Sequence, residues 1–287
     1  MSSAISLTTP MRSNLLSLQS TQTNISLTQN RLATGLKVSS ALDNAQSFFQ
    51  ASAMSNRAND LARLQDGMGL AVKTFEAADK GIKAITKLAE NMSAIAKSAK
   101  DATTAADRAD FQTQFEELRA QMAAVAKDSG FNGINLLGGD SLETEFSEDG
   151  VSKQSVTGVD WRGFGSGTAF AATNAVVGIA QATTWNSATL ATGTTAIEAS
   201  MTQVKDAIAE MRKQAAVFGS NLTVVKIRED FTKDMINTLK GGADGLTLAD
   251  QNEEAANLLA LQTRQQLSQQ ALSLATQSEQ GILRLFG

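Results

Sequence analysis

The sequence predicts a mainly α-helical fold: a long antiparallel helical rod, coiled-coil helices at both ends of the chain, and a small β-hairpin segment in the middle. Only one proline occurs in 287 residues, so little in the chain stops extended helices. Apolar residues recur in steps of three and four over long stretches, which is typical of helices that pack along a seam. Aromatic residues make up 5% of the chain, which favours helix-on-helix packing over a globule built on large aromatic side chains.

The first helix is expected to begin at Thr9, an N-cap residue that is followed by Pro10 at the first helical position. Of the first 36 residues, 19 are Ser, Thr, Asn or Gln, so this helix buries too little apolar area to stand alone and needs a partner. Its expected seam alternates steps of four and three through Met11, Leu15, Leu18, Gln22, Ile25, Gln29, Leu32 and Leu36.

A longer helix is expected from Asp43 to about Lys100, with a seam that alternates regularly from Leu61 to Ala99. Apolar residues beside this seam widen the stripe, which predicts contact with more than one neighbouring helix. Thr104 and Asp107 have the spacing of a capping box, and the helix that they open is expected to end near Gly130 as an antiparallel return.

The middle of the chain changes in composition, because Gly, Thr and Ser become frequent between about 131 and 195. Short strands are expected there, over 152–159 and 169–177. Helical spacing returns at Met201, and the helix is expected to be interrupted at Gly219 and to stop at Gly241 and Gly242.

A last helix is expected after a cap made by Thr247 with Asp250, or by Asp250 with Glu253. Its seam contains polar positions at Gln265 and Ser268, as the first helix contains glutamines. Both chain ends also carry few charges, so we expect the two terminal helices to pair inside an assembly rather than to stand in water. The apolar seam of this helix comprises Leu258, Leu261, Leu272, Ala275, Ile282 and Phe286.

The composition argues against a catalytic site, a metal site and nucleic-acid binding. Histidine and cysteine are absent, which removes the commonest metal ligands and the commonest general base, so no catalytic site, metal or cofactor is expected. The acidic pairs Glu116-Glu117 and Glu253-Glu254 point in different directions on a helix and are expected to be solvated or to cap helix ends. With 25 basic and 29 acidic residues, the chain offers no wide positive field for nucleic acid.

Membrane insertion is not expected either, because no run of about 20 apolar residues exists. Residues 1–24 are polar throughout and show no apolar block before a cleavage site, so no Sec-type signal peptide is expected.

Four motifs, in order along the chain, resemble those of the bacterial flagellins. The first runs from Arg31 to Ala45 and includes Gly35, Asp43 and Asn44. The second is the Phe131-Asn132-Gly133 turn, the third covers 246–275, and the last is the ending Ile282-Leu283-Arg284-Leu285-Phe286. The resemblance covers about 200 residues and skips Gly138 to Thr195, the part in which flagellins diverge most.

The resemblance implies a secreted structural subunit that polymerises into the flagellar filament and drives swimming without any active site. It implies an inner-core domain of residues 1–43 and 246–287 and an outer rod domain of 44–245, with 138–195 as the variable segment. Expected partners are further copies of the chain, the flagellar type III export apparatus, the junction and cap proteins, and an export chaperone. The expected self-assembly core comprises Leu15, Leu18, Ile25, Leu32, Leu36, Leu258, Leu261, Leu272, Ile282, Leu285 and Phe286. A core-to-rod signature is assigned to Arg31, Leu32, Gly35, Asp43 and Asn44, and a turn signature to Phe131, Asn132 and Gly133.

Three alternatives stay open at this point. The hook-filament junction protein of the flagellum resembles flagellin at both ends. A helical chemoreceptor-like signalling rod needs longer uninterrupted heptads than the break at Gly138 to Thr195 allows. An enzyme lacks any convergent group of polar residues.

Overall fold

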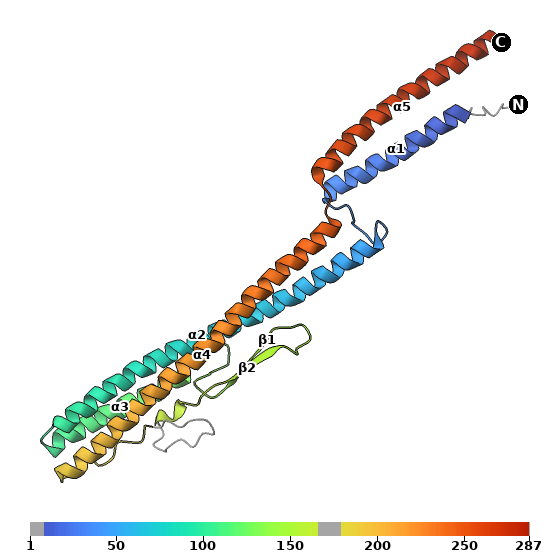
Figure 1. Ribbon diagram of the computed structural model, residues 1–287. Coiled ribbons are helices and arrows are strands. Elements are labelled where there is room, and N and C mark those ends of the chain that lie inside the picture. The colour runs from blue at the N-terminus through green and yellow to red at the C-terminus, as the bar shows by residue number, and fades with distance from the viewer. Residues whose placement is uncertain (1–8, 166–178, 287) are drawn as a thin grey trace. The chain divides into compact units, whose positions relative to one another are not determined.

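The structure, a computed structural model, describes residues 9–165 and 179–286 and confirms a mainly α-helical fold with one small β-hairpin (Figure 1). The expected strand over 169–177 lies outside the described residues. In chain order the elements are α1 (Thr9–Thr34), α2 (Ala45–Asp101), α3 (Ala105–Asp128), β1 (Ser141–Glu145), β2 (Lys153–Thr157), the 3-10 helix η1 (Arg162–Gly165), α4 (Leu190–Thr247) and α5 (Gln251–Phe286).

The contacts divide the chain into two compact units. The first unit joins 1–58 to 237–287, and the second consists of 59–236. The boundaries lie inside α2 and α4: that on α2 comes after the limit of 43 that the motifs indicate, and that on α4 comes before the limit of 246. The assignment of an inner and an outer filament domain therefore stays a prediction about the polymer.

The core of the second unit lies along the seam of α2 that the sequence predicts. From Leu61 to Ala99, every seam position except the half-buried Leu64 is buried. Phe75 meets Phe218 of α4 with ring centroids 6.1 Å apart, so the two long helices face each other at this level. Leu88 and Ile95, beside the seam, also pack against the core. The widened stripe thus has the additional contacts that its width predicts.

Helix α3 begins with the predicted cap. The Thr104 hydroxyl accepts a hydrogen bond from the Asp107 amide at 3.1 Å and donates one to the Asp107 carboxylate at 2.6 Å. The helix ends at Asp128, and the chain then reverses at Asn132 and Gly133, whose φ angles are +48° and +81°. Asn and Gly are the residues that adopt such left-handed angles most readily, which confirms the predicted turn.

Polar side chains of α3 bind the backbone of 179–187, and this the sequence analysis missed. Arg108, only 2% exposed, donates to the carbonyl oxygens of Trp185 and Ser187, each at 2.9 Å. One oxygen of the Glu116 carboxylate accepts from the Ala182 amide, and the other accepts from Arg119. Glu116 is therefore half-buried and paired, and the expectation of a solvated or capping role is wrong.

The β-hairpin packs with one face on α4. Leu142, Thr144 and Val156 alternate with exposed neighbours and are buried, as expected when one face of a two-stranded sheet is covered. Strand β2 lies within the predicted 152–159, whereas β1 was not predicted. Its sequence, Ser-Leu-Glu-Thr-Glu, offers a single large apolar residue, and Thr144 takes the second buried position.

Helix α4 is longer than predicted at both ends. It begins at Leu190 and continues without a break through Gly219, Gly241 and Gly242 to Thr247. A helical glycine costs only about 1 kcal/mol relative to alanine, so packing with α2 on either side outweighs it. Gly242 also has a packing reason, since a Cβ atom there would lie 3.1 Å from the Met54 sulfur.

In the first unit, α1 and α5 pair side by side as predicted, but α1 uses a different register (Figure 1). The three positions Leu15, Gln22 and Gln29 are exposed, and their places in the seam are taken by their preceding neighbours, of which Thr21 and Thr28 are buried. A threonine hydroxyl can be buried in a helix because it donates to the preceding turn, as Thr21 does to the Ser17 carbonyl oxygen at 2.8 Å. On α5, the expected seam positions up to Ala275 are half-buried, including the polar pair: Leu258, Leu261, Gln265, Ser268, Leu272 and Ala275.

The helical glycines of α4 allow a test of this packing. Gly219 has open space where a Cβ atom would lie, whereas a Cβ atom on Gly193 would lie 2.8 Å from the Trp185 carbonyl oxygen. We therefore expect Gly219→Ala to raise the free energy of unfolding by about 0.5 to 1 kcal/mol and Gly193→Ala to lower it. Urea denaturation of the two variants beside the parent chain measures both changes. A loss of stability in Gly219→Ala would contradict the uninterrupted course of α4.

Candidate assembly site: the terminal helices and their joint

Two connectors, 35–44 and 248–250, meet in a short antiparallel clasp that we call the joint. Leu36 and Leu248 form a β-bridge, and the Ala249 amide donates to the Gly35 carbonyl oxygen at 2.9 Å. The amide of Lys37 donates to the Thr247 carbonyl oxygen at 2.8 Å. Backbone bonds hold this clasp, so its geometry depends little on the identity of most side chains in it.

Each helix end at the joint is capped by a residue that suits it. Gly35 ends α1 with φ of +72°, a left-handed angle that glycine adopts without strain. The side-chain oxygen of Asn44 accepts from the Ser47 amide at 3.1 Å and caps α2. Asp250 accepts from the Asn252 and Glu253 amides and caps α5, so the second of the two predicted caps is confirmed. These caps make the chain leave and re-enter helices within a few residues.

An ion pair joins α1 to α5 beside the clasp. Arg31 lies 2.9 Å from Glu254, whose side chain is 11% exposed, whereas that of Arg31 is 33% exposed. The expectation that Glu254 is solvated or caps a helix is therefore wrong, because it is buried and paired. Arg31 lies 223 positions away in the sequence, so it could not be matched to Glu254 from spacing alone.

Asp43 organises the connector between α1 and α2. Its carboxylate accepts from the amides of Ser39 and Ser40 at 3.0 and 2.9 Å, and from both hydroxyl groups. These hydrogen bonds, of which that from the Ser39 hydroxyl contributes most, lower the pKa of Asp43 from its usual value of 3.8. The carboxylate therefore stays charged over the whole physiological pH range.

The joint brings together the whole predicted core-to-rod signature. Gly35, Asp43 and Asn44 lie in the connectors, and Arg31 and Leu32 lie in the last turn of α1. The turn residues 131–133 belong to the second unit and are a separate feature. Lys37 lies within the first motif but outside the assigned signature set, and its ammonium group donates to the Gly245 carbonyl oxygen at 3.1 Å.

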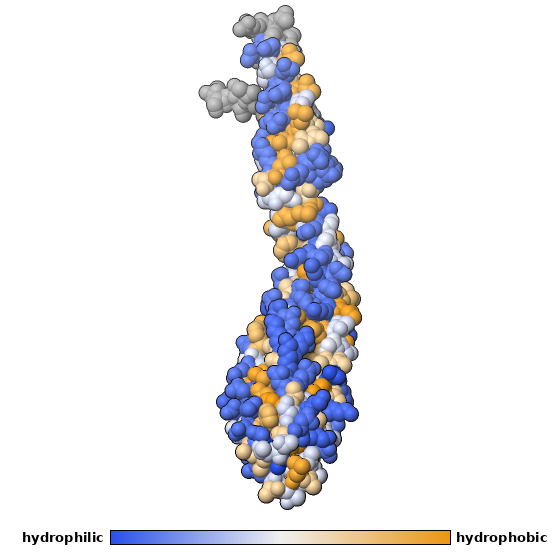
Figure 2. Space-filling view, turned by 90° about the vertical axis from the view of Figure 1, so that its left-hand side faces the viewer, coloured by the Kyte–Doolittle hydropathy of each residue, from blue (hydrophilic) through white to orange (hydrophobic). Residues whose placement is uncertain are grey.

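The terminal helices carry a second apolar stripe that their pairing leaves uncovered, and apolar patches reach the surface of this unit in Figure 2. We call it the outer stripe and define it by five exposed leucines: Leu16, Leu27, Leu259, Leu267 and Leu274. On α5 they are 61 to 67% exposed. The doubled leucines 15-16 and 258-259 signal this stripe, because adjacent residues on a helix point about 100° apart and cannot serve one seam.

Of the predicted self-assembly residues, Ile25 is buried and Leu15 is exposed. The side chains of Ile282, Leu285 and Phe286 lie outside the described residues. The remaining six are half-buried: Leu18, Leu32, Leu36, Leu258, Leu261 and Leu272. Most of the predicted set therefore holds α1 to α5 within one chain, and the outer stripe adds a surface that is still free.

The joint is built from backbone hydrogen bonds, helix caps and one ion pair. Over residues 9–165 and 179–286, no group of three His, Cys, Asp or Glu side chains is placed to hold a metal ion. In the same described part, none of the helices combines the length and the apolar character that crossing a membrane requires.

Comparison with known proteins agrees with the motifs. The bacterial flagellin N-terminal helical region matches residues 5–141, and the bacterial flagellin C-terminal helical region matches 201–286. A flagellin of Brucella melitensis is 31% identical over 282 residues, covering 95% of each chain. Flagellin FljK of Caulobacter vibrioides is 30% identical over 275 residues, covering 95% of this chain and 94% of the relative. The crystal structure of Bacillus cereus flagellin aligns with a TM-score of 0.46 at 17% identity, over 58% of this chain and 88% of that one.

This chain therefore belongs to the bacterial flagellins. Flagellins are structural proteins that polymerise into the extracellular flagellar filament, and a filament subunit is accordingly the functional class of this chain.

The electrostatics of the joint can be tested by titration. A group whose pKa is lowered on folding stabilises the fold above its unfolded pKa, and this contribution is lost as the pH falls through the folded pKa. We expect the Asp43 carboxyl carbon, followed by NMR, to titrate below 3.8, and a Ser39→Ala, Ser40→Ala variant to bring the midpoint back up. A midpoint at or above the usual value in the parent chain would show that the hydrogen bonds to Asp43 are not formed in solution.

Proposed function

We propose that filament assembly uses the outer stripe of the terminal helices as the contact between subunits. The joint supports this by holding α1 and α5 together as one unit through the Arg31–Glu254 pair and the backbone clasp. With the seam buried between α1 and α5, the outer stripe is an apolar surface that these two helices still offer to neighbouring subunits. The exposure of the five outer-stripe leucines beside a buried seam is the main support for this contact.

The energetics support the same conclusion. A leucine side chain contributes about 1.5 to 3 kcal/mol when it passes from full exposure to full burial. The outer stripe has several such leucines per subunit, and every subunit of a polymer buries its own set. Ordering and immobilisation offset part of this gain, which accounts for a monomer that remains in solution and a polymer that is stable once formed.

Assembly outside the cell requires export and guidance. We propose that the chain leaves through the flagellar type III export apparatus, with a chaperone bound before export, and polymerises beneath a cap protein onto a junction protein. Family membership supports this route. The outer stripe is the surface that an export chaperone would have to shield, because it is the apolar surface open to unwanted association.

The second candidate function is that of a hook-filament junction protein, which shares the terminal regions. Electron microscopy of the purified chain, added to short filament seeds, separates the two. Long tubes with continuous growth are expected for a filament subunit. Short rings or terminal caps that stop growth would instead assign the chain to the junction.

Point changes in the outer stripe test the assembly contact itself. Leu267→Asp changes a residue that is 61% exposed in the single chain, so the monomer should keep its helicity and melting temperature. In the polymer the carboxylate would lose its hydration in every subunit, which is strongly unfavourable. We therefore expect no filament growth from seeds, as measured by light scattering and microscopy.

Three further variants complete this test. Leu18→Asp, at a half-buried seam position, and deletion of residues 282–287 should also abolish filaments while leaving a largely helical monomer, since the second unit has its own core. Lys87→Asp, on an exposed position of α2, should polymerise normally. Normal filaments from Leu267→Asp would refute the role of the outer stripe.

A further inference from the structure

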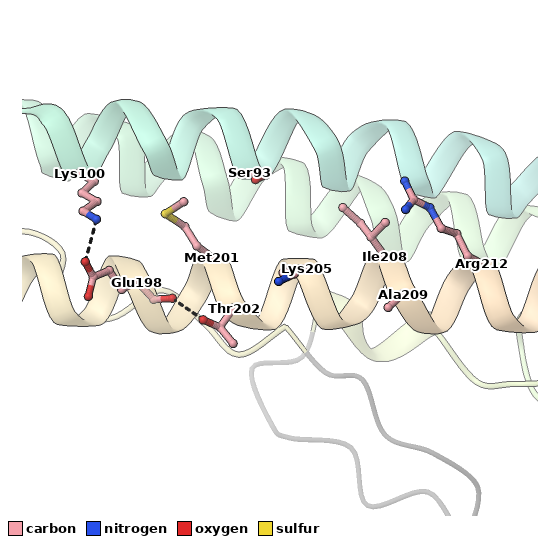
Figure 3. Close-up of a pocket in the computed structure, with 9 residues that line it drawn as sticks. All are labelled: Ser93, Lys100, Glu198, Met201, Thr202, Lys205, Ile208, Ala209 and Arg212. Atoms are coloured by element: carbon pink, nitrogen blue, oxygen red, sulfur yellow. Dashed lines mark hydrogen bonds and ion pairs between the residues drawn. The ribbon is translucent and has the colours of Figure 1, made fainter.

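A groove between α2 and α4 in the second unit lies far from the joint along the chain. It has a volume of about 740 Å³. On α2 it is lined by Ser93 and Lys100, and on α4 by residues between Glu198 and Arg212 (Figure 3). Its floor includes the half-buried apolar side chains of Met201 and Ile208. The groove therefore combines an apolar floor with charged walls.

The walls are predominantly basic. Three cations, Lys100, Lys205 and Arg212, face one carboxylate, Glu198, which binds Lys100 at 2.8 Å. Arg212 approaches Glu90 only to 3.9 Å, and no ion pair of Lys205 is found among the described residues. Two of the three cations thus keep most of their capacity to bind an acidic partner.

The β-hairpin of the same unit has the complementary character. Residues 141–157 contain four carboxylates and one lysine. At the tip, Glu148 and Asp149 are exposed, and Val151 is 81% exposed. The tip therefore offers an apolar side chain and carboxylates within a few residues.

The hairpin and the groove lie on opposite sides of α4. The hairpin contacts this helix through Gln154, which donates to Asn221 at 2.6 Å, and through Phe146, which lies 5.4 Å below Arg228. At about 100° per residue, Asn221 lies roughly 160° around the helix from Lys205. The hairpin of a chain therefore rests on the side of α4 that faces away from its own groove.

We propose that the groove receives the hairpin tip of a second copy of the chain. Val151 would rest on the apolar floor, and the tip carboxylates would pair with Lys205 and Arg212. Because the two surfaces differ and point in opposite directions, a bound pair still has the groove of one copy and the tip of the other available, which is the geometry of an open polymer rather than a closed dimer. This inference rests on the proposed function and identifies a contact between subunits that is independent of the outer stripe.

Disulfide trapping tests the contact directly, because the chain contains no cysteine. Val151→Cys combined with Ala209→Cys, a groove residue, places one thiol in each surface. Filaments grown from this variant and mildly oxidised should give a ladder of covalent multimers on a non-reducing gel. Val151→Cys combined with Lys87→Cys, which lies outside the groove, should give none.

The outcomes separate this contact from the polymer itself. Filaments that form normally but give no ladder, or the same ladder with the control pair, would overturn the hairpin contact and leave the filament function standing. A parent chain that forms no filaments from seeds would overturn the proposed function and this inference together.

A charge exchange gives a second readout that does not depend on oxidation. Lys205→Glu should slow seeded growth by about tenfold at low salt and by less at high salt, because screening weakens charge pairing. Adding Glu148→Lys to that variant should restore growth, and Lys87→Glu alone should have no effect. Unchanged growth of Lys205→Glu at low salt would contradict the contact.

Discussion

Two paired helices can bury only the stripes along which they touch, and the terminal helices of this chain carry more apolar surface than that. Ile25 is buried in the seam between α1 and α5, and leucines of both helices are half-buried there, while the outer stripe is exposed to solvent. The other helical segments of this unit, the start of α2 and the end of α4, leave these leucines exposed. Flagellins polymerise, and in the proposed function this surplus of apolar surface drives that assembly, because it becomes buried between subunits.

The other contacts of the first unit hold α1 and α5 in one arrangement, so that the outer stripe keeps a fixed position on them. The backbone clasp and the caps at Gly35, Asn44 and Asp250 fix where the terminal helices begin and end. The Arg31–Glu254 pair is partly buried, and such pairs specify an arrangement more reliably than they stabilise it. A defined pairing of α1 with α5 means that every subunit presents the same stripe, which a regular polymer requires.

Much of this architecture could be predicted from the sequence, for reasons that differ between elements. The seam of α2 was predictable from Leu61 to Ala99 because apolar residues repeat there without competition. In α1 the repeat is sparse, so Leu15 was preferred to its polar neighbour, although the pairing uses the small residues Thr21 and Thr28. The helix through Gly219 was unpredictable from local preference, since tertiary packing outweighs a glycine penalty of about 1 kcal/mol.

In the candidate site, too, some residues could be predicted from the sequence and others could not. Gly35, Asp43 and Asn44 were identified by their motif and meet at the joint, but the pairing of Glu254 with Arg31 depends on a fold that brings together residues 223 positions apart. Buried polar contacts such as those of Arg108 were also beyond the sequence, because an arginine in a helix reads as solvated until its partners are placed.

The central claim is that the outer stripe changes from solvent to protein when subunits assemble. Single Leu259→Cys, Leu267→Cys and Leu274→Cys variants of this cysteine-free chain allow the thiol's reaction rate with a maleimide to be measured in monomer and filament. The account predicts rapid labelling of all three in the monomer and strong protection in the filament. Equal rates in both states would show that the stripe remains in solvent and that another surface builds the polymer.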